Sequence, residues 1–385
     1  MTGKGKHMII SAYKQNDYGI ENVQKTANKI FDDLGGIEKF VQKGTKVLIK
    51  PNLLAKRAPE RATTTHPAVV EAIAKAVIAA GGIATIADSP GGPYSKEMLK
   101  GVYNTCGMSN AADSSGAQLN FDTGDRLVLL GGEFSDLRVN IINPVLENDI
   151  IINVAKLKTH AFTYFSGCVK NLFGAISGIY KTQYHFKYKE RNQFSNMLVD
   201  LCEYIKPDIS FIDGVWGMEG NGPSNGAPKH VGVLLASESP YAADFAACLA
   251  AGVDIENVDT NTNAVRRGLF EPDKMKYRGD FDVENTGINF KAPDSQMNMG
   301  NMPKFITSLA EGILSSPYPK FVKERCIACN RCVEACPAVA LKMEDKIPKL
   351  TKNKCIKCYC CQEMCPHDAI SLKKGLFEFI NKIVR

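Results

Sequence analysis

Nine of the thirteen cysteines lie between residues 326 and 365, and their spacing is the feature of this sequence best suited to chemistry. They form two runs, residues 326–337 and 355–366, that each match C-x₂-C-x₂-C-x₃-C-P at every position. Three thiolates spaced in this way can surround one face of a cubane iron–sulfur cluster, and the fourth, followed by proline, points away from that face. The two runs therefore predict two [4Fe–4S] clusters.

Zinc sites and disulfide bonds are the other common uses of closely spaced cysteines. Zinc takes four ligands, usually as two separated pairs, and explains neither the third cysteine of each run nor its C-P ending. A disulfide-stapled protein would not leave its larger part so sparsely linked. The four remaining cysteines are scattered singly: Cys106, Cys168, Cys202 and Cys248. Cys202 and Cys248 lie in helical apolar patterns and are predicted to be packed in the core, and packing is favoured over catalysis for Cys168.

The segment from about residue 318 to 373 resembles the bacterial-type two-cluster ferredoxins over its whole length. In those proteins the fourth cysteine of each run ligates the other cluster, so the resemblance implies a crossed assignment. The first cysteine set is Cys326, Cys329, Cys332 and Cys365. The second cysteine set is Cys355, Cys358, Cys361 and Cys336. A ninth cysteine, Cys360, is predicted to be a packed thiol, and residues 340–343 and 347–350 are predicted to form a hairpin.

The rest of the chain alternates short apolar runs with amphipathic stretches. Strands are predicted at residues 46–49, 83–87, 150–154, 209–212 and 231–236, and helices at 66–80, 192–204 and 241–251. This alternation is typical of an α/β fold with a mostly parallel sheet and helices on both faces. We therefore predict an α/β domain over residues 1–313, a small α+β ferredoxin-like domain over 314–373 and a C-terminal amphipathic helix over 374–385.

Polar side chains follow four of the predicted strands. In open α/β sheets, ligands bind beyond the carboxyl ends of the strands, so these side chains can converge on one pocket. Ammonium groups and a histidine are predicted to surround one anionic ligand there: Lys50, Lys156, Lys158, His160 and Lys170. Amide and hydroxyl groups that could bind the same ligand are Asn52, Ser89 and Asn171. A phosphate or a carboxylate suits such a site.

Two carboxylates, Asp213 and Glu219, are predicted to balance the charge of this pocket, because ammonium groups held close together repel one another. Asp213 is assigned to ligand binding, and Glu219 to catalysis together with His160 and Lys156. Each residue has a simpler alternative, since a lysine after a strand is usually solvated and an aspartate often caps a turn. The glycine-rich run 217–223 matches neither the Walker pattern nor the dinucleotide fingerprint.

Six short motifs resemble, in order, the family called "domain of unknown function 362". They are Lys50-Pro-Asn, Thr65-His-Pro, Ala87-Asp-Ser-Pro-Gly, Lys156-Leu-Lys-Thr-His, Val169-Lys-Asn-Leu-Phe-Gly and Gly217-Met-Glu-Gly-Asn-Gly-Pro. The resemblance spans most of residues 8 to 255, and members of the family often carry a two-cluster tail. It supports the domain layout and the pocket but implies no substrate. There is also a looser similarity in style to the N-terminal half of nickel-pincer lactate racemases.

Composition and charge argue against several other classes of protein. A net charge of +6 on 385 residues is too mild for a nucleic-acid binder. No apolar run approaches the roughly 18 residues of a membrane span, and the N-terminus lacks a secretory apolar segment. We therefore expect a soluble, cytoplasmic protein with no transmembrane segment and no nucleic-acid partner.

The expected function is that of an iron–sulfur oxidoreductase served by a redox partner protein. Its two [4Fe–4S] clusters would exchange electrons with an anionic substrate or cofactor in the α/β domain. One alternative is a non-enzymatic electron carrier or assembly partner whose α/β domain docks another protein. A further alternative is a distant relative of the nickel-pincer racemases.

Overall fold

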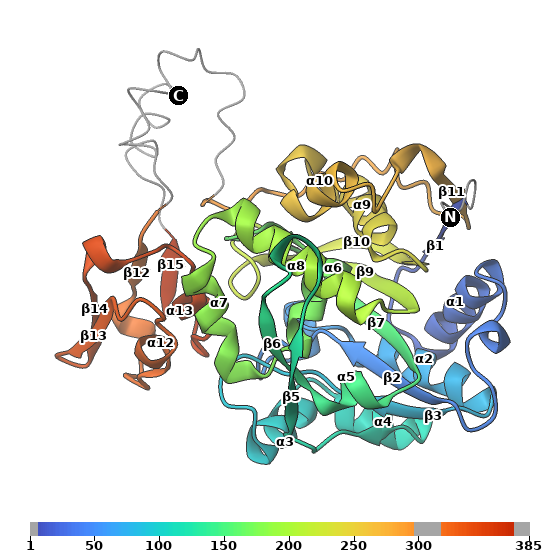
Figure 1. The fold of residues 1–385 in the computed structure, drawn as a ribbon, viewed down its shortest axis with the longest axis horizontal. Coiled ribbons are helices and arrows are strands. Elements are labelled where there is room, and N and C mark those ends of the chain that lie inside the picture. The colour runs from blue at the N-terminus through green and yellow to red at the C-terminus, as the bar shows by residue number, and fades with distance from the viewer. Residues whose placement is uncertain (1–6, 296–316, 373–385) are drawn as a thin grey trace, which may run out of the picture.

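The computed structural model of the chain describes residues 7–295 and 317–372 (Figure 1). The predicted terminal helix at 374–385 and the predicted domain boundary at 313–314 lie outside these residues.

The larger part is built on one sheet, with strands in the order β11-β1-β10-β9-β7-β2-β3-β4 and β8 paired to β7. These strands are β1 (Met8–Lys14), β2 (Lys46–Pro51), β3 (Ile83–Ile86), β4 (Gln118–Leu119), β7 (Ile150–His160), β8 (Tyr164–Ser166), β9 (Ile209–Glu219), β10 (Ala227–Ser237) and β11 (Met275–Arg278). A separate hairpin contains β5 (Asp125–Leu129) and β6 (Arg138–Ile142).

Most neighbouring strands of the sheet are parallel. Parallel pairs join β2 to β3 and β7, β3 to β4, β7 to β9 and β1 to β11. Antiparallel pairs join β10 to β1 and β9, and β8 to β7. The prediction of an α/β fold with a mostly parallel sheet is therefore confirmed.

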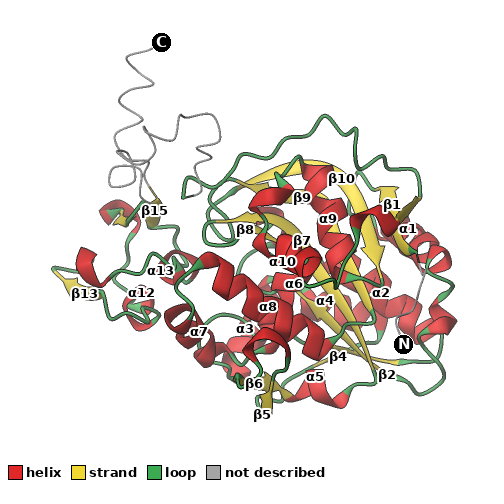
Figure 2. Cartoon of the chain, turned by 45° about the horizontal axis from the view of Figure 1, so that its top comes forward, coloured by secondary structure: helices red, strands yellow, loops and turns green. Residues whose placement is uncertain are grey.

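Helices cover both faces of this sheet (Figure 2). They are α1 (Ile20–Asp33), α2 (Pro67–Ala79), α3 (Lys96–Thr105), α4 (Met108–Ser115), α5 (Asn143–Glu147), α6 (Cys168–Asn171), α7 (Lys181–Lys187), α8 (Arg191–Ile205), α9 (Pro240–Ala251) and α10 (Asp259–Arg266). Because successive strand residues point to opposite faces, Leu48 packs in one core and Ile49 in the other. Among the described residues, no helix is long and apolar enough to cross a membrane.

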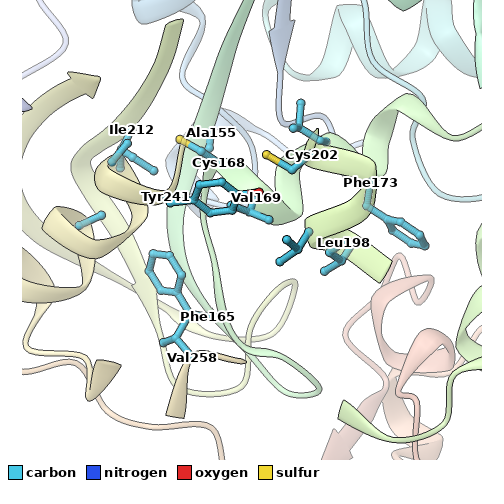
Figure 3. Close-up of a cluster of buried hydrophobic side chains, with 14 of the residues drawn as sticks. Ala155, Phe165, Cys168, Val169, Phe173, Leu198, Cys202, Ile212, Tyr241 and Val258 are labelled. Carbon is cyan, nitrogen blue, oxygen red and sulfur yellow. The ribbon is translucent and has the colours of Figure 1, made fainter. Parts of the chain in front are cut away.

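The core beneath α6, α8 and α9 contains three of the scattered cysteines. Cys168, Cys202 and Cys248 are buried among apolar side chains. Figure 3 shows Cys168 and Cys202 within this cluster, beside Ala155 and Val169. The prediction that these cysteines are packed in the core is confirmed.

Strands β7 and β9 are longer than the sequence predicted. We expected them to end at residues 154 and 212, with the polar residues beyond in loops, and this was wrong, since they continue to His160 and Glu219. Lys156 and Asp213 are opposite one another in the parallel register, and their side chains form an ion pair at 2.9 Å. The pair neutralises both charges, so the buried strands can continue through polar residues.

The C-terminal part is a small unit of short strands and helices. Strand β12 (Pro319–Phe321) pairs antiparallel with β15 (Ile370–Leu372), and β13 (Leu341–Glu344) pairs antiparallel with β14 (Ile347–Leu350). Two short helices, α12 (Arg331–Glu334) and α13 (Cys360–Glu363), complete it. The predicted hairpin is therefore confirmed.

A single arginine of the α/β domain holds the segment that follows α13. The guanidinium of Arg57 donates to the carbonyl oxygens of Cys365 at 2.7 Å and Pro366 at 2.9 Å, and to a carboxylate oxygen of Asp368 at 2.8 Å. Arg61 donates to the other oxygen of Asp368 at 2.7 Å, but its side chain is 49% exposed. Arg57 is therefore the better shielded of the two contacts.

Close backbone packing fixes the same interface from a second side. A Cβ atom on Gly91 would lie 2.6 Å from the sulfur of Met364, so the Met364 side chain lies directly against the backbone of this glycine. On a third side, the amide of Asn225 donates to the carbonyl oxygen of Ile370 at 2.8 Å. The two parts of the chain thus meet through directed contacts rather than through a flexible tether.

We predict that Arg57→Ala loosens this interface without removing iron. Loss of a charge-assisted hydrogen-bond donor costs about 2 kcal/mol, which corresponds to roughly thirty-fold faster hydrogen exchange over residues 363–370. Arg61→Ala is the matched control, and its exposed contact should change exchange only slightly. Equal effects of the two variants would show that Arg57 is not the main contact.

Candidate functional site

Each predicted cysteine set surrounds a cavity of its own, with a volume of about 20 Å³. The first cavity is lined by Cys326, Cys329, Cys332 and Cys365. The second is lined by Cys336, Cys355, Cys358 and Cys361. The structure thus brings together the two crossed sets, and thiolates around a small cavity fit a cubane cluster. No group of three or more His, Cys, Asp or Glu side chains in the described parts could hold a single metal ion.

Cys360 lies in neither of these cavities. It is buried, 4% exposed, and lines a third cavity on the other side of α13. Its placement agrees with the prediction that it is not a ligand, but it does more than fill the core. It forms part of the wall between the cysteine sets and the α/β domain.

This third cavity, which we call the lysine cavity, has a volume of about 80 Å³ and lies beyond the ends of β2 and β3. Three ammonium-bearing side chains line it: Lys158 of β7, Lys170 of α6 and Lys181 of α7. Predicted ligand-binding residues that also line it are Asn52, Ser89 and Asn171. Segments far apart in the sequence therefore place cations and polar groups around one small space.

The three lysines have few partners in the described parts of the chain. Lys158 donates to the side-chain oxygen of Asn52 at 2.6 Å and to the carbonyl oxygen of Thr63 at 2.7 Å. Lys181 donates to the carbonyl oxygen of Ser89. Lys170 forms no hydrogen bond or ion pair there, although its ammonium lies 5.8 Å from the centre of a phenylalanine ring. An ammonium carries three hydrogens, so all three lysines keep donors for a ligand.

Burial lowers the pKa of these lysines. The pKa of Lys158 falls to about 7, chiefly through burial and next through the positive charge of Lys170. Burial likewise lowers the pKa of Lys181 to about 7, and that of Lys170 below its ordinary value. A bound anion would stabilise the protonated forms and raise these pKa values again.

A carboxylate from α13 reaches into this cluster of cations. Glu363 lines the lysine cavity, and its Oε1 lies 3.2 Å from Nε2 of His160, although the pair is not aligned as a hydrogen bond. Burial opposes its ionisation, but the contact with His160 and the charge of Lys170 outweigh that effect and lower the pKa of Glu363 to about 2. The carboxylate is therefore ionised at neutral pH.

His160 is neutral and holds its proton on the atom that faces Glu363. Its Nδ1 accepts from the backbone N–H groups of Phe162 at 3.0 Å and Thr163 at 3.2 Å, which leaves the proton on Nε2. Burial, followed by the charge of Lys170, lowers the pKa of His160 to about 4. The predicted catalytic histidine thus touches the cavity through Glu363 and is not itself part of its wall.

Four further predicted site residues lie outside the cavity wall. Lys50 is buried and pairs with Asp88 at 2.6 Å, while also donating to a backbone oxygen at 2.7 Å. Lys156 and Asp213 pair with each other, and Tyr18 bridges them with hydrogen bonds of 2.8 Å. Strong ion pairs occupy these groups, so the structure does not bring them to the lysine cavity.

The fourth of these residues, Glu219, ends β9 at a different place. Its carboxylate accepts from the ammonium of Lys229 at 3.1 Å and from the backbone N–H of Lys291 at 3.0 Å. It does not line the lysine cavity. Its contacts are those of a residue that fixes a loop against the sheet edge.

The sequence analysis did not single out Lys181 or Glu363. Lys181 follows no apolar strand, so no local pattern marks it. Glu363 lies inside the second cysteine run, between Cys361 and Cys365. No local signal marks it, because the first run has Glu334 at the equivalent position. His185 also lines the cavity, and burial lowers its pKa to about 3.

A family model described as "Domain of unknown function (DUF362)" matches residues 47–249, and a model described as a 4Fe-4S dicluster domain matches residues 325–369. The thylakoid-associated protein sll1697 of a Synechocystis strain is 33% identical over 261 residues, which cover 68% of this chain and 79% of that protein.

Two solved structures overlap with part of the chain. The lactate racemase apoprotein from Thermoanaerobacterium thermosaccharolyticum has a TM-score of 0.37 and 16% identity, and covers 61% of this chain and 57% of its own. A protein from Thermotoga maritima has a TM-score of 0.36 and 12% identity, with 65% and 60% covered. The chain therefore spans less than two thirds of either structure. From the family match over more than half of its residues, this chain belongs to the domain of unknown function 362 family and carries a 4Fe–4S dicluster ferredoxin-like domain.

Proposed function

We propose that this protein is a cytoplasmic iron–sulfur oxidoreductase in which two [4Fe–4S] clusters exchange electrons with an anionic substrate held in the lysine cavity. A redox partner protein would supply or accept the electrons. The observation that carries the proposal is the shared helix α13. Cys361 at one side of it lines the second cysteine cavity, while Cys360 and Glu363 line the lysine cavity.

The residues of the lysine cavity fit the binding of one carboxylate or phosphate group. Lys170 offers its free ammonium hydrogens, Lys158 has one left after its two hydrogen bonds, and the buried hydroxyl of Ser89 has no partner. Charge-assisted hydrogen bonds of this kind are the strong ones. Such groups would fix the acidic end of a substrate and exclude water from it.

The charge of these lysines depends on whether the cavity is occupied. Without a ligand, burial lowers the pKa values of Lys158 and Lys181 to about 7. A bound anion would raise them again, so the lysines stay protonated while they hold the acidic group. When bound, the clusters supply electrons one at a time, and the lysines would hold the substrate.

The first test of this function is the iron content. Anaerobically purified protein should contain about eight iron and eight acid-labile sulfide per chain. Cys336→Ala should remove the cluster held by the second cysteine set, and Cys365→Ala the cluster held by the first. The matched control is Cys360→Ala, which should keep about eight iron. Reconstituted protein that holds only zinc, or at most four iron, would contradict the proposal.

The second test is the binding of sulfate, whose charge is constant over the pH range used. Sulfate should raise the melting temperature of the protein that carries its clusters, because a ligand that binds only the folded state stabilises that state by mass action. The affinity should fall at least tenfold from pH 6 to pH 9, because Lys158 and Lys181 are protonated below their pKa values of about 7 and lose the proton as pH rises. An affinity that does not change with pH would argue against the lysines as the binding groups.

Variants of one helix make this second test specific. Lys181→Ala should weaken sulfate binding roughly tenfold, as expected for one charge-assisted hydrogen bond. Lys187→Ala, an exposed lysine of the same helix α7, should leave it unchanged. Both variants should keep their iron, because the cysteine sets lie outside this helix. Unaltered sulfate binding in Lys181→Ala would leave the alternative of an electron carrier whose α/β domain docks another protein.

A further inference from the structure

A larger cleft adjoins the lysine cavity and lies between the α/β domain and the ferredoxin-like region. Its volume is about 430 Å³. The two spaces are adjacent, because Gly91, Gly92, Gly178, Thr182, Glu363 and Met364 line both. We call this larger space the interdomain cleft.

The sizes of the two spaces indicate different roles. A water molecule takes about 30 Å³ in the liquid, so the 80 Å³ of the lysine cavity hold one small anionic group and little more. The interdomain cleft falls within the range of roughly 300–1,000 Å³ that is typical of sites for small organic molecules. A substrate whose acidic end fills the lysine cavity would therefore extend into the cleft.

The lining of the cleft is also different in chemistry. Apolar side chains provide much of it: Ala55, Pro93, Met98, Ala335, Met364 and Pro366. Methionine is flexible and polarizable, so it adapts to flat or irregular apolar ligands. The charged side chains of the remaining wall are Lys56, Arg57, Arg331, Glu334 and Glu363. The guanidinium of Arg57 is already bonded to Cys365, Pro366 and Asp368. Two carboxylates oppose the other two cations, so the cleft suits an apolar body rather than a second strongly charged group.

One cysteine of the first set belongs to the wall of this cleft. Cys365 lines both the interdomain cleft and the first cysteine cavity, and Arg331 does the same. By contrast, none of the described residues lines both the lysine cavity and either cysteine cavity. The part of a substrate that shares a wall with a cysteine set is therefore its body, not its acidic end.

Building on the proposed function, we propose that the substrate is an amphipathic acid. Its anionic group binds Lys158, Lys170 and Lys181, and its apolar body, which carries the redox-active group, lies in the interdomain cleft against Cys365. The cluster of the first cysteine set is then the one that exchanges electrons with it. Glu363 and Met364 stand at the junction between the two spaces.

Monoalkyl phosphates of increasing length test this inference on the full, cluster-loaded chain. Isothermal calorimetry under anaerobic conditions would compare methyl, butyl and hexyl phosphate. Affinity should rise roughly four-fold for each methylene that the cleft buries. Hexyl phosphate, but not methyl phosphate, should also change the electron paramagnetic resonance spectrum of the reduced cluster that is lost in Cys365→Ala.

Two substitutions in one loop provide the matched variants. Ala55→Trp fills the cleft and should reduce the affinity for hexyl phosphate to that for methyl phosphate. Ala58→Trp, at an exposed position outside the cleft, should preserve the dependence on chain length. Iron content would confirm that both variants retain their clusters.

The possible failures are distinguishable. If all three phosphates bind equally well, and Lys181→Ala weakens the binding of each, the lysine cavity is retained as the anion site and the proposal of an amphipathic substrate is refuted. If hexyl phosphate binds as tightly to Lys181→Ala as to the unaltered chain, its phosphate group does not lie in the lysine cavity, and the inference also fails. If none of the phosphates binds, the proposed function fails together with the inference.

Discussion

The removal of ammonium groups from water at the centre of the sheet is the constraint on which both the fold and the site depend. Moving one ion out of water costs several kcal/mol even in a relaxed protein, and Lys50, Lys156 and Lys158 are each at most 1% exposed. Two of them are neutralised within the sheet, Lys50 by Asp88 and Lys156 by Asp213. Lys158 has only neutral oxygen acceptors, so its charge requires compensation from outside the sheet.

The ferredoxin-like region provides part of that compensation, which makes domain packing and the site a single feature. Asp88 and Glu363 are the carboxylates that line the lysine cavity, and Asp88 is committed to Lys50. Among the described residues that line the cavity, Glu363 is therefore the carboxylate left to balance the positive charges of the lysines. It belongs to the cluster-bearing segment. The α/β domain in turn holds that segment through hydrogen bonds donated by the guanidinium of Arg57. Undocking would expose Cys365 and leave the lysines with their charges unbalanced.

The sequence predicts the parts of this arrangement that depend on local spacing. Cluster ligands recur at short, fixed intervals, and buried strands are apolar runs, so both are visible without a structure. Membership of the cavity depends on pairing between distant residues. Lys156 and Lys158 lie two positions apart, where side chains share a face of a strand. A shift of register against β9 between these positions gives Lys156 the partner Asp213 and turns Lys158 toward the cavity.

The two sides of the ferredoxin-like region explain how one chain could serve both a partner protein and a small substrate. Within the first cysteine set, Cys329 is exposed and Cys365 is buried against the interdomain cleft. Ile327, between Cys326 and Cys329, is 62% exposed, which suits a transient apolar contact with another protein. Electrons could thus enter at the outer rim of this set and leave at its inner rim. An electron carrier needs only the outer rim, where it would exchange electrons with a partner protein. The lysine cavity and the cleft would bring a substrate to the inner rim. The existence of that inner side is the physical reason to favour an enzyme over a carrier.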